Sequence, residues 1–343
     1  MPAAAPSKAY ARAGVDIDLG NRLKGGLGRA LAATHGPEVL GKAGGFGGLF
    51  RADFKGMREP VLVGSIDGVG TKLKVAVELG RHDTVGQDLV NHCVNDIAVL
   101  GARPLFFLDY IGTGKLEPAV FKSLLAGLSK ACAAAGCALI GGETAQMPGI
   151  YQGKDYDLAG TIVGVVDKKK IIDGRRIKSG DAVLGLAADG LHTNGYSLAR
   201  DILFNKMGLA LDVRLPGLKK TLGEELLRVH PNYQPRMAAL PKGVLKGAAH
   251  ITGGGLVDNL PRVLPDTCDA VIDTAAWKTP RLCQILQEGG AVPAEEMFQV
   301  FNMGVGMTLV VAEKDAAPTL ATLGKGAFRI GRIERGTGRT RLQ

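Results

Sequence analysis

The chain has 343 residues, enough for two ordinary domains, and its 46% hydrophobic and 22% charged residues are typical of a globular protein rather than a disordered one. The formal net charge is +9, but the basic residues are scattered apart from residues 168–170 and 332–341, and only 5% of residues are aromatic, which disfavours nucleic-acid binding. The five cysteines show no CxxC spacing and no apolar run approaches the roughly 20 residues that span a bilayer, so we expect a cytoplasmic protein without structural zinc, disulfides or membrane partners.

The first half of the chain alternates strand and helix patterns after a glycine-rich start. In residues 1–59 we predict one helix near residues 21–34 and a flexible loop at residues 41–48. Strands are predicted at residues 60–65, 105–110, 137–140 and 157–167, and helices at residues 85–100 and 118–135.

A polar segment with turn residues and charges, residues 172–181, separates this half from a second one with the same rhythm. We therefore predict two domains, residues 1–172 and 173–343. Strands are predicted at residues 181–188, 268–273 and 304–312, and helices at residues 195–204, 234–245, 279–287 and 314–323. The predicted fold class is α/β of the α+β type, with two mixed-sheet domains whose strand order stays open.

A candidate phosphate and metal motif follows the first predicted strand. Asp67 stands at the strand end, Gly68 and Gly70 form a Gly-x-Gly turn, and Thr71 and Lys72 come next. A carboxylate can hold a metal ion there, the glycine backbone can approach phosphates, and the lysine can neutralise charge. The alternative is a plain strand-to-helix turn.

The helix predicted at residues 85–100 gathers five short polar side chains in one arc of roughly 140°. They are Asp88, Asn91, His92, Asn95 and Asp96. Exposed helix faces usually carry Lys and Glu, so this face suits metal–phosphate coordination; a solvated face or capping contacts are the alternative.

Two more carboxylates occur where predicted strands end. Asp109 ends the apolar segment LFFLDY, and Glu143 follows the strand CALI through two glycines. Ligands in open α/β sheets gather at such strand ends, and carboxylate oxygens suit Mg²⁺ together with substrate phosphates. With Asp67 and Asp96, these residues are the predicted magnesium ligands, expected to converge around a metal-bound triphosphate.

Two glycine-rich turns in the second half precede helices and can bind anions. The first contains His192, Thr193 and Asn194, where His192 is a candidate for proton transfer and Thr193 or Asn194 can alternatively cap the helix. The second contains the run Thr252, Gly253, Gly254 and Gly255, which can alternatively be a flexible loop. His230 lies beside turn residues and is predicted to face solvent.

Together these segments resemble one known family. They are residues 13–17 (AGVDI), 44–48 (GGFGG), 67–72 (DGVGTK), 81–84 (RHDT), 94–96 (VND), 104–110 (PLFFLDY), 141–145 (GGETA), 147–149 (MPG), 192–197 (HTNGYS), 252–255 (TGGG) and 301–307 (FNMGVGM). Their order and spacing resemble the phosphoribosylformylglycinamidine cyclo-ligases, or aminoimidazole ribonucleotide (AIR) synthetases, over nearly the whole chain.

The resemblance implies that formylglycinamidine ribonucleotide and ATP become aminoimidazole ribonucleotide, ADP and phosphate, through an iminophosphate, in purine biosynthesis. It implies Mg²⁺ as cofactor and a homodimer in which N-terminal strands form a shared β-barrel. It also implies the following contacts: ATP phosphates with Gly45, Gly47, Gly48, Gly68, Gly70, Thr71 and Lys72; ribose phosphate with Thr193, Asn194, Thr252, Gly253, Gly254 and Gly255; catalysis by Lys72 and His192.

One departure from the family is that a lysine common near position 28 is absent, with Lys24 one turn earlier. Two other function classes remain open at this point. One is a small-molecule kinase or another ATP-dependent member of the same superfamily, and the other is a non-enzymatic nucleotide-binding or assembly protein. An ADP-release assay on candidate substrates tests the first alternative, and the second predicts ATP binding without substrate-dependent ADP release.

Overall fold

The computed structural model describes residues 8–26, 28–41 and 45–343, and its strands form two sheets. The first sheet has the order β1-β4-β2-β3 and the second has the order β10-β7-β9-β5-β8-β6. The strands are β1 Pro60–Gly68, β2 Arg103–Thr113, β3 Ala138–Gln146, β4 Tyr156–Asp167, β5 Ala182–Ala187, β6 Gly247–His250, β7 Cys268–Ile272, β8 Val305–Val311, β9 Ala327–Arg335 and β10 Thr340–Leu342.

Helices connect these strands in both halves. They are α1 Ala9–Arg12, α2 Ile17–Gly25, α3 Gly28–Ala32, α4 Lys72–Leu79, α5 Val85–Ala98, α6 Pro118–Ala135, α7 Tyr196–Arg200, α8 Leu222–Leu226, α9 Gln234–Ala238, α10 Gly255–Asn259, α11 Arg281–Gly290, α12 Ala294–Val300 and α13 Glu313–Leu323. In the described part of the chain, none of them combines the length and apolarity needed to cross a bilayer.

The first sheet is mixed. β1 and β2 both pair antiparallel with β4, whereas β3 pairs parallel with β2 through the crossover helix α6. Proline at the first position of α6 and Gly136 in the left-handed conformation after its end fix the length of that helix. α5 and α6 cover the same face of this sheet, and they approach closely because Gly86 and Gly127 leave no room for a side chain between them.

On the opposite face of the first sheet, the edge strand β1 exposes apolar side chains that no other described residue covers. Along β1 the exposed and half-buried residues alternate, and the exposed positions include Leu62, 61% exposed, and Ile66, 71% exposed. β-strand alternation puts every second residue on this outer face, while Val61 and Val63 pack towards the helices. Apolar side chains on a sheet face are usually covered by another layer of protein rather than left in water.

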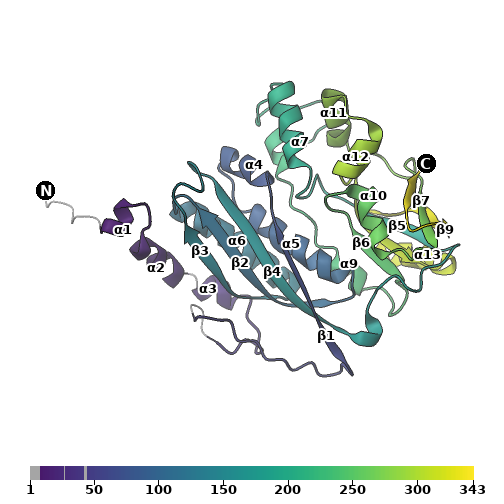
Figure 1. Ribbon diagram of the computed structural model, residues 1–343, viewed down its shortest axis with the longest axis horizontal. Helices are drawn as coiled ribbons and strands as arrows, with labels where there is room; N and C mark the ends of the chain where they lie inside the picture. The colour runs from purple at the N-terminus through teal and green to yellow at the C-terminus, as the bar shows by residue number, and fades with distance from the viewer. Residues whose placement is uncertain (1–7, 27, 42–44) are drawn as a thin grey trace.

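The two halves share one apolar core. Its largest cluster joins Leu89 and Phe107 from the first half to Leu226 and Phe301 from the second. In Figure 1 the purple-to-teal half and the green-to-yellow half lie side by side, with α5 facing the second half. The predicted α/β fold with two mixed sheets is therefore confirmed.

Candidate active site between the two halves

The polar face of α5 is an interface rather than a solvated surface. Asp88, His92 and Asn95 are buried, and Asp96 is only partly exposed. The partners of this face are contributed mainly by the second half. They are the main-chain N–H of His230 for Asp88, the carbonyl of His230 for Asn91, Thr193 for His92, Pro231 and Tyr233 for Asn95, and His250 for Asp96. We call these residues and their partners the α5 seam.

Two carboxylates meet at one end of the α5 seam. His92 Nε2 lies 2.7 Å from Asp67 Oδ2 and 3.7 Å from Asp96 Oδ2. His250 Nδ1 lies 2.8 Å from Asp96 Oδ1, and the Ser65 hydroxyl donates to Asp96 Oδ2 at 3.1 Å. Asp67 comes from β1, and Asp96 lies on α5, so a strand end and a helix face are joined as the sequence predicts.

These contacts keep both carboxylates ionised. Burial works to raise the pKa of Asp67, but the hydrogen bond and charge of His92 outweigh it and hold the pKa below its ordinary value. His250 does the same for the pKa of Asp96. Burial works to lower the pKa of His92, and the hydrogen bond to Asp67 and the charge of Asp96 raise it overall.

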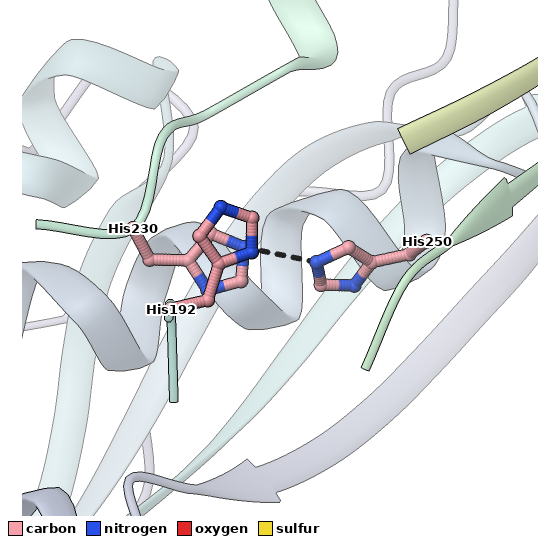
Figure 2. Close-up of side chains that lie close together, drawn as sticks. All are labelled: His192, His230 and His250. Carbon is pink, nitrogen blue, oxygen red and sulfur yellow. Dashed lines mark hydrogen bonds between the residues drawn. The ribbon is translucent and has the colours of Figure 1, made fainter. Parts of the chain in front are cut away.

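Two further imidazoles, those of His192 and His230, lie beside His250, as Figure 2 shows. His230 Nε2 lies 2.9 Å from His250 Nε2, and the rings of His192 and His230 are stacked with centroids 3.9 Å apart and planes 17° apart. Burial, together with the positive charges of neighbouring groups, lowers the pKa of His192 and His230 well below the ordinary value. The prediction that His230 faces solvent is wrong, because its side chain is fully buried.

The three ring nitrogens are close enough to suggest a metal ion, but their orientation does not suit one. His192, His230 and His250 offer nitrogens within 4.8 Å of one another. A histidine binds a metal through a lone pair that lies in its ring plane. Two stacked, nearly parallel rings cannot both direct such a lone pair at one ion between them. We therefore interpret His192 and His230 as a buried support for His250, because they are stacked on each other and His230 is hydrogen-bonded to His250.

The glycine turns of both halves meet beside the carboxylates. A side chain at Gly70 would lie 3.8 Å from the carbonyl oxygen of Thr193, and the hydroxyls of Thr71 and Ser197 are 3.0 Å apart. A side chain at Gly253 would lie 3.6 Å from the Asn194 amide. Three of the predicted loops, those of Gly68–Thr71, Thr193–Asn194 and Thr252–Gly255, therefore come together.

The side chain of Asn259 fixes the conformation of the Thr252–Gly255 loop. The Asn259 amide donates to the carbonyls of Thr252, Gly253 and Gly255. Gly254 and Gly255 have φ of 97° and 57°, a conformation that a residue with a side chain adopts only under strain. Nearby, Asn194 Oδ1 is buried and has no hydrogen-bond partner among the described residues, so an acceptor is left available at this loop junction.

Lys72 has a different environment from the one predicted. Its side chain is fully buried, its Nζ lies 2.7 Å from Asp88 Oδ2, and it donates to the carbonyls of His192 and Arg228. Burial lowers the pKa of Lys72 and raises that of Asp88, while the opposite charge of each partner resists the shift. In this structure the ammonium ties the two halves together and is not open to a phosphate on the surface.

His192 is likewise buried. Its φ is 65°, and it is one of three non-glycine residues with positive φ in the described part of the chain. Lys72 binds its carbonyl and Tyr233 Oη lies 3.3 Å from its Nε2. The contacts of Lys72 and Tyr233 stabilise the turn in this unusual conformation, and this turn fixes the positions of Thr193 and Asn194.

The expected convergence of all four carboxylates does not occur within one chain. Asp67 and Asp109 are both paired with Gly160 of β4, so they share the helix-covered face but stand two strand spacings apart, roughly 10 Å. Burial raises the pKa of Asp109 to about 7, with the charge of Glu143 adding to the shift. Glu143 lies inside β3 and pairs with Tyr110, out of phase with Asp109, so it is exposed on the outer face.

The first glycine loop also lies elsewhere. A side chain at Gly48 would contact Ile140 of β3, and β3 is the edge strand opposite β1. Gly45 and Gly47 are exposed beside it, and residue 44 lies outside the described residues. In the stretch between Lys24 and Gly28, residue 27 also lies outside them.

Four members of this site were not assigned individual roles from the sequence. Asp88 and His92 were within the predicted polar arc, and His250 stands directly before the glycine run, so their positions carried a signal. The place of His230 depends on Asp88 and Asn91 binding its main chain, and no local pattern reveals that contact.

The geometry suits a divalent cation with an anionic ligand. Asp67 and Asp96 are ionised, their side chains are 39% and 24% exposed, and carboxylate oxygens can accept more than one partner. Main-chain N–H groups of glycine turns favour anions. The residues present therefore fit a Mg²⁺-bound phosphate placed between the halves.

Comparison with known proteins identifies the family to which the chain belongs. Residues 55–166 match the model of "AIR synthase related protein, N-terminal domain", and residues 178–342 match that of "AIR synthase related protein, C-terminal domain". Solved structures with this fold include a thiamine-monophosphate kinase from Stenotrophomonas maltophilia, with a TM-score of 0.68 and 18% identity over 92% of this chain and 94% of that one. The hydrogenase maturation protein HypE in complex with ATP gives a TM-score of 0.66 and 20% identity, covering 94% and 90% of the two chains. The chain belongs to the AIR synthase related family.

Relatives of higher sequence identity show to which group within this family the chain belongs. The chain is 52% identical to the phosphoribosylformylglycinamidine cyclo-ligase of Citrifermentans bemidjiense and 51% identical to that of Geotalea uraniireducens, over 94% of each chain. It is 48% identical to that of Syntrophus aciditrophicus over 96% of each chain. Within the AIR synthase related family, it belongs with the phosphoribosylformylglycinamidine cyclo-ligases, and the predicted resemblance is confirmed.

Proposed function

We propose that this protein uses ATP to close the imidazole ring of formylglycinamidine ribonucleotide, giving aminoimidazole ribonucleotide, ADP and phosphate. The observation that carries the proposal is the meeting of Asp67 and Asp96 with glycine turns from both halves. About 50% identity to cyclo-ligases over nearly the whole chain supports the choice of substrate.

The reaction needs activation of a poor leaving group. The γ-phosphoryl group of ATP passes to the formyl amide oxygen, the amidine nitrogen attacks the activated carbon, and that oxygen leaves within phosphate. Such a transfer depends mainly on positioning and on neutralising charge. Mg²⁺, when bound, supplies that neutralisation, and we assign Asp67 and Asp96 to hold it.

The remaining residues of the candidate site are assigned to position the substrates. We assign the Gly68, Gly70 and Thr71 turn to the ATP phosphates. Thr193, Asn194 and the loop Thr252–Gly255 are assigned to the ribose phosphate, and the buried acceptor of Asn194 supports this choice. His92 and His250 hold the two carboxylates in place and keep them ionised.

Lys72 and His192 have positioning roles in this proposal, since both side chains are buried and the Lys72 ammonium and His192 Nε2 already have partners. The predicted roles of Asp109, Glu143, Gly45, Gly47 and Gly48 stay predictions. So does the domain boundary between residues 172 and 173, which lies between the last strand of the first sheet and the first strand of the second.

A homodimer is the second part of the proposal. The uncovered outer face with Leu62 and Ile66 suits a second copy of the same sheet, which would close a shared barrel and bury both faces. A cytoplasmic location is also proposed, and the five unpaired, buried cysteines agree with a reducing compartment.

Steady-state release of ADP with formylglycinamidine ribonucleotide tests the activity. Replacing Asp67 with Asn keeps the size of the side chain but removes its charge, and we expect turnover to fall on the order of 100-fold or more with an unchanged circular dichroism spectrum. The exposed Asp212, changed to Asn, is the matched control. Near-normal turnover of Asp67→Asn would refute the metal role, and ADP release with a stable phosphorylated product would favour the kinase alternative.

A further inference from the structure

A cavity that does not include the carboxylates lies at the joint between the two halves. Its volume is about 530 Å³, within the range of small-molecule sites. The floor is apolar and includes Ala98 at the end of α5 and Ala102 just before β2, together with Leu240 and Leu245 from the second half. The cavity therefore has an apolar surface contributed by both halves.

The rim of this cavity is basic. Lys169, Lys170, Arg176 and Lys242 line it, and no acidic residue is among its described lining residues. The Arg176 guanidinium is fixed by hydrogen bonds to the carbonyls of Gly243 and Leu245. Two lysines of the run at residues 168–170, Lys169 and Lys170, therefore line a cavity that has no part in the proposed reaction.

An apolar floor below several cations suits a ligand with an anionic group and an apolar body. Guanidinium and ammonium groups bind phosphate oxygens through charge-assisted hydrogen bonds, and small alkyl side chains accept a flat ring. We propose that this cavity binds a small organic phosphate of the size of a purine nucleoside monophosphate. This inference does not depend on the proposed reaction.

Binding there would reach the α5 seam directly. Ala98 lies two residues after Asp96 on the same helix, and the lining residue Gln234 follows Tyr233, whose main-chain N–H donates to Asn95. Figure 1 shows α9, which begins at Gln234, beside the end of α5. A ligand that contacts both elements favours the arrangement in which the halves are docked, so it should raise the thermal midpoint of unfolding.

Isothermal titration calorimetry of the full-length protein with adenosine 5′-monophosphate tests the proposal. We expect binding that weakens by about tenfold or more when Lys169→Ala and Lys242→Ala are combined, because two phosphate-binding cations are lost. Lys168→Ala is the matched control, since this neighbouring lysine pairs with Glu59 and is not among the lining residues. Asp67→Asn separates the cavity from the proposed reaction site, and it should leave this binding unchanged.

Two further titrations identify the ligand chemistry. Adenosine and inorganic phosphate should each bind more weakly than the nucleotide. Equal affinity of wild type and the double variant, or a loss of binding in Asp67→Asn alone, would overturn the site. Inorganic phosphate binding as tightly as the nucleotide would overturn the apolar part of the assignment, and adenosine doing so would overturn the role of the cations.

Discussion

At the scale of single residues, charge pairs within the α5 seam decide what each side chain can do. Lys72 follows a glycine turn that reads as a phosphate motif, yet its Nζ is bound by Asp88 and two carbonyls. The sequence pattern shows only that a lysine follows the turn. Its ammonium is turned away from the turn by contacts such as the carbonyl of Arg228, which is 156 residues away in the chain. The pattern alone could not have predicted that contact.

The first prediction concerns this pair. Replacing Lys72 with Met leaves the Asp88 carboxylate buried without its partner, and the free energy of unfolding should fall by about 3–5 kcal/mol. Urea denaturation measures it. The double variant Lys72→Met with Asp88→Leu removes both charges and should recover most of that loss. Lys74→Met, in which an exposed pair with Asp155 is broken, should change stability by no more than about 1 kcal/mol.

At the scale of elements, the periodicity of α5 was the best guide to the site. The helix predicted at residues 85–100 is observed at Val85–Ala98, and the predicted polar arc is the face that carries Asp96 and His92. The arc did not reveal its partners, because these come from short segments such as β6 and the His230 turn, which have too little pattern to predict. Likewise β3 was expected to end at residue 140, but it continues to Gln146, so Glu143 points outward from within the strand.

The second prediction concerns the imidazoles behind this helix. A histidine whose pKa is lowered on folding is neutral in the folded protein and takes up a proton on unfolding below pH ~6.5. His230 should therefore lower the free energy of unfolding by about 1.4 kcal/mol for each pH unit below pH ~6.5, and should contribute no slope above it. The raised pKa values of His92 and Asp109 act in the opposite direction, so the contribution is isolated by comparing variants.

Urea midpoints of wild type and His230→Gln, measured from pH 7.5 down to about pH 5.5, provide that comparison. The stability difference between the two proteins should shrink as the pH falls, since only wild type carries the acid-sensitive group. A constant difference across this range would contradict a neutral, buried His230.

At the scale of the whole molecule, the two mixed sheets were predictable from the alternation of strands and helices, and so was the family. The docking of the two sheets was not predictable, because the residues that join the halves lie more than 100 positions apart in the chain. The alternation of β1 also does not show by itself whether another part of the chain covers Leu62 and Ile66, which the described residues leave exposed. That required the structure, in which α5 and α6 occupy only one face of the first sheet.

The third prediction concerns this open face. Ile66→Lys places a charge in the proposed dimer interface, whereas Lys is easily accommodated on a face that stays in water. Light scattering coupled to size exclusion should give a dimer for wild type and a monomer for the variant. Glu38→Lys, an exposed residue outside the first sheet, is the control for added charge. A monomeric wild-type protein would rule out the shared barrel.

The α5 seam has a consequence for how the protein becomes active during synthesis. Asp96 is oriented by His250, which the ribosome adds 154 residues later. A chain released or stalled after the first sheet has both candidate metal-binding carboxylates but not the imidazole and glycine turns that complete the cleft. We expect such a fragment to hydrolyse no ATP, so that nucleotide is consumed only by finished molecules.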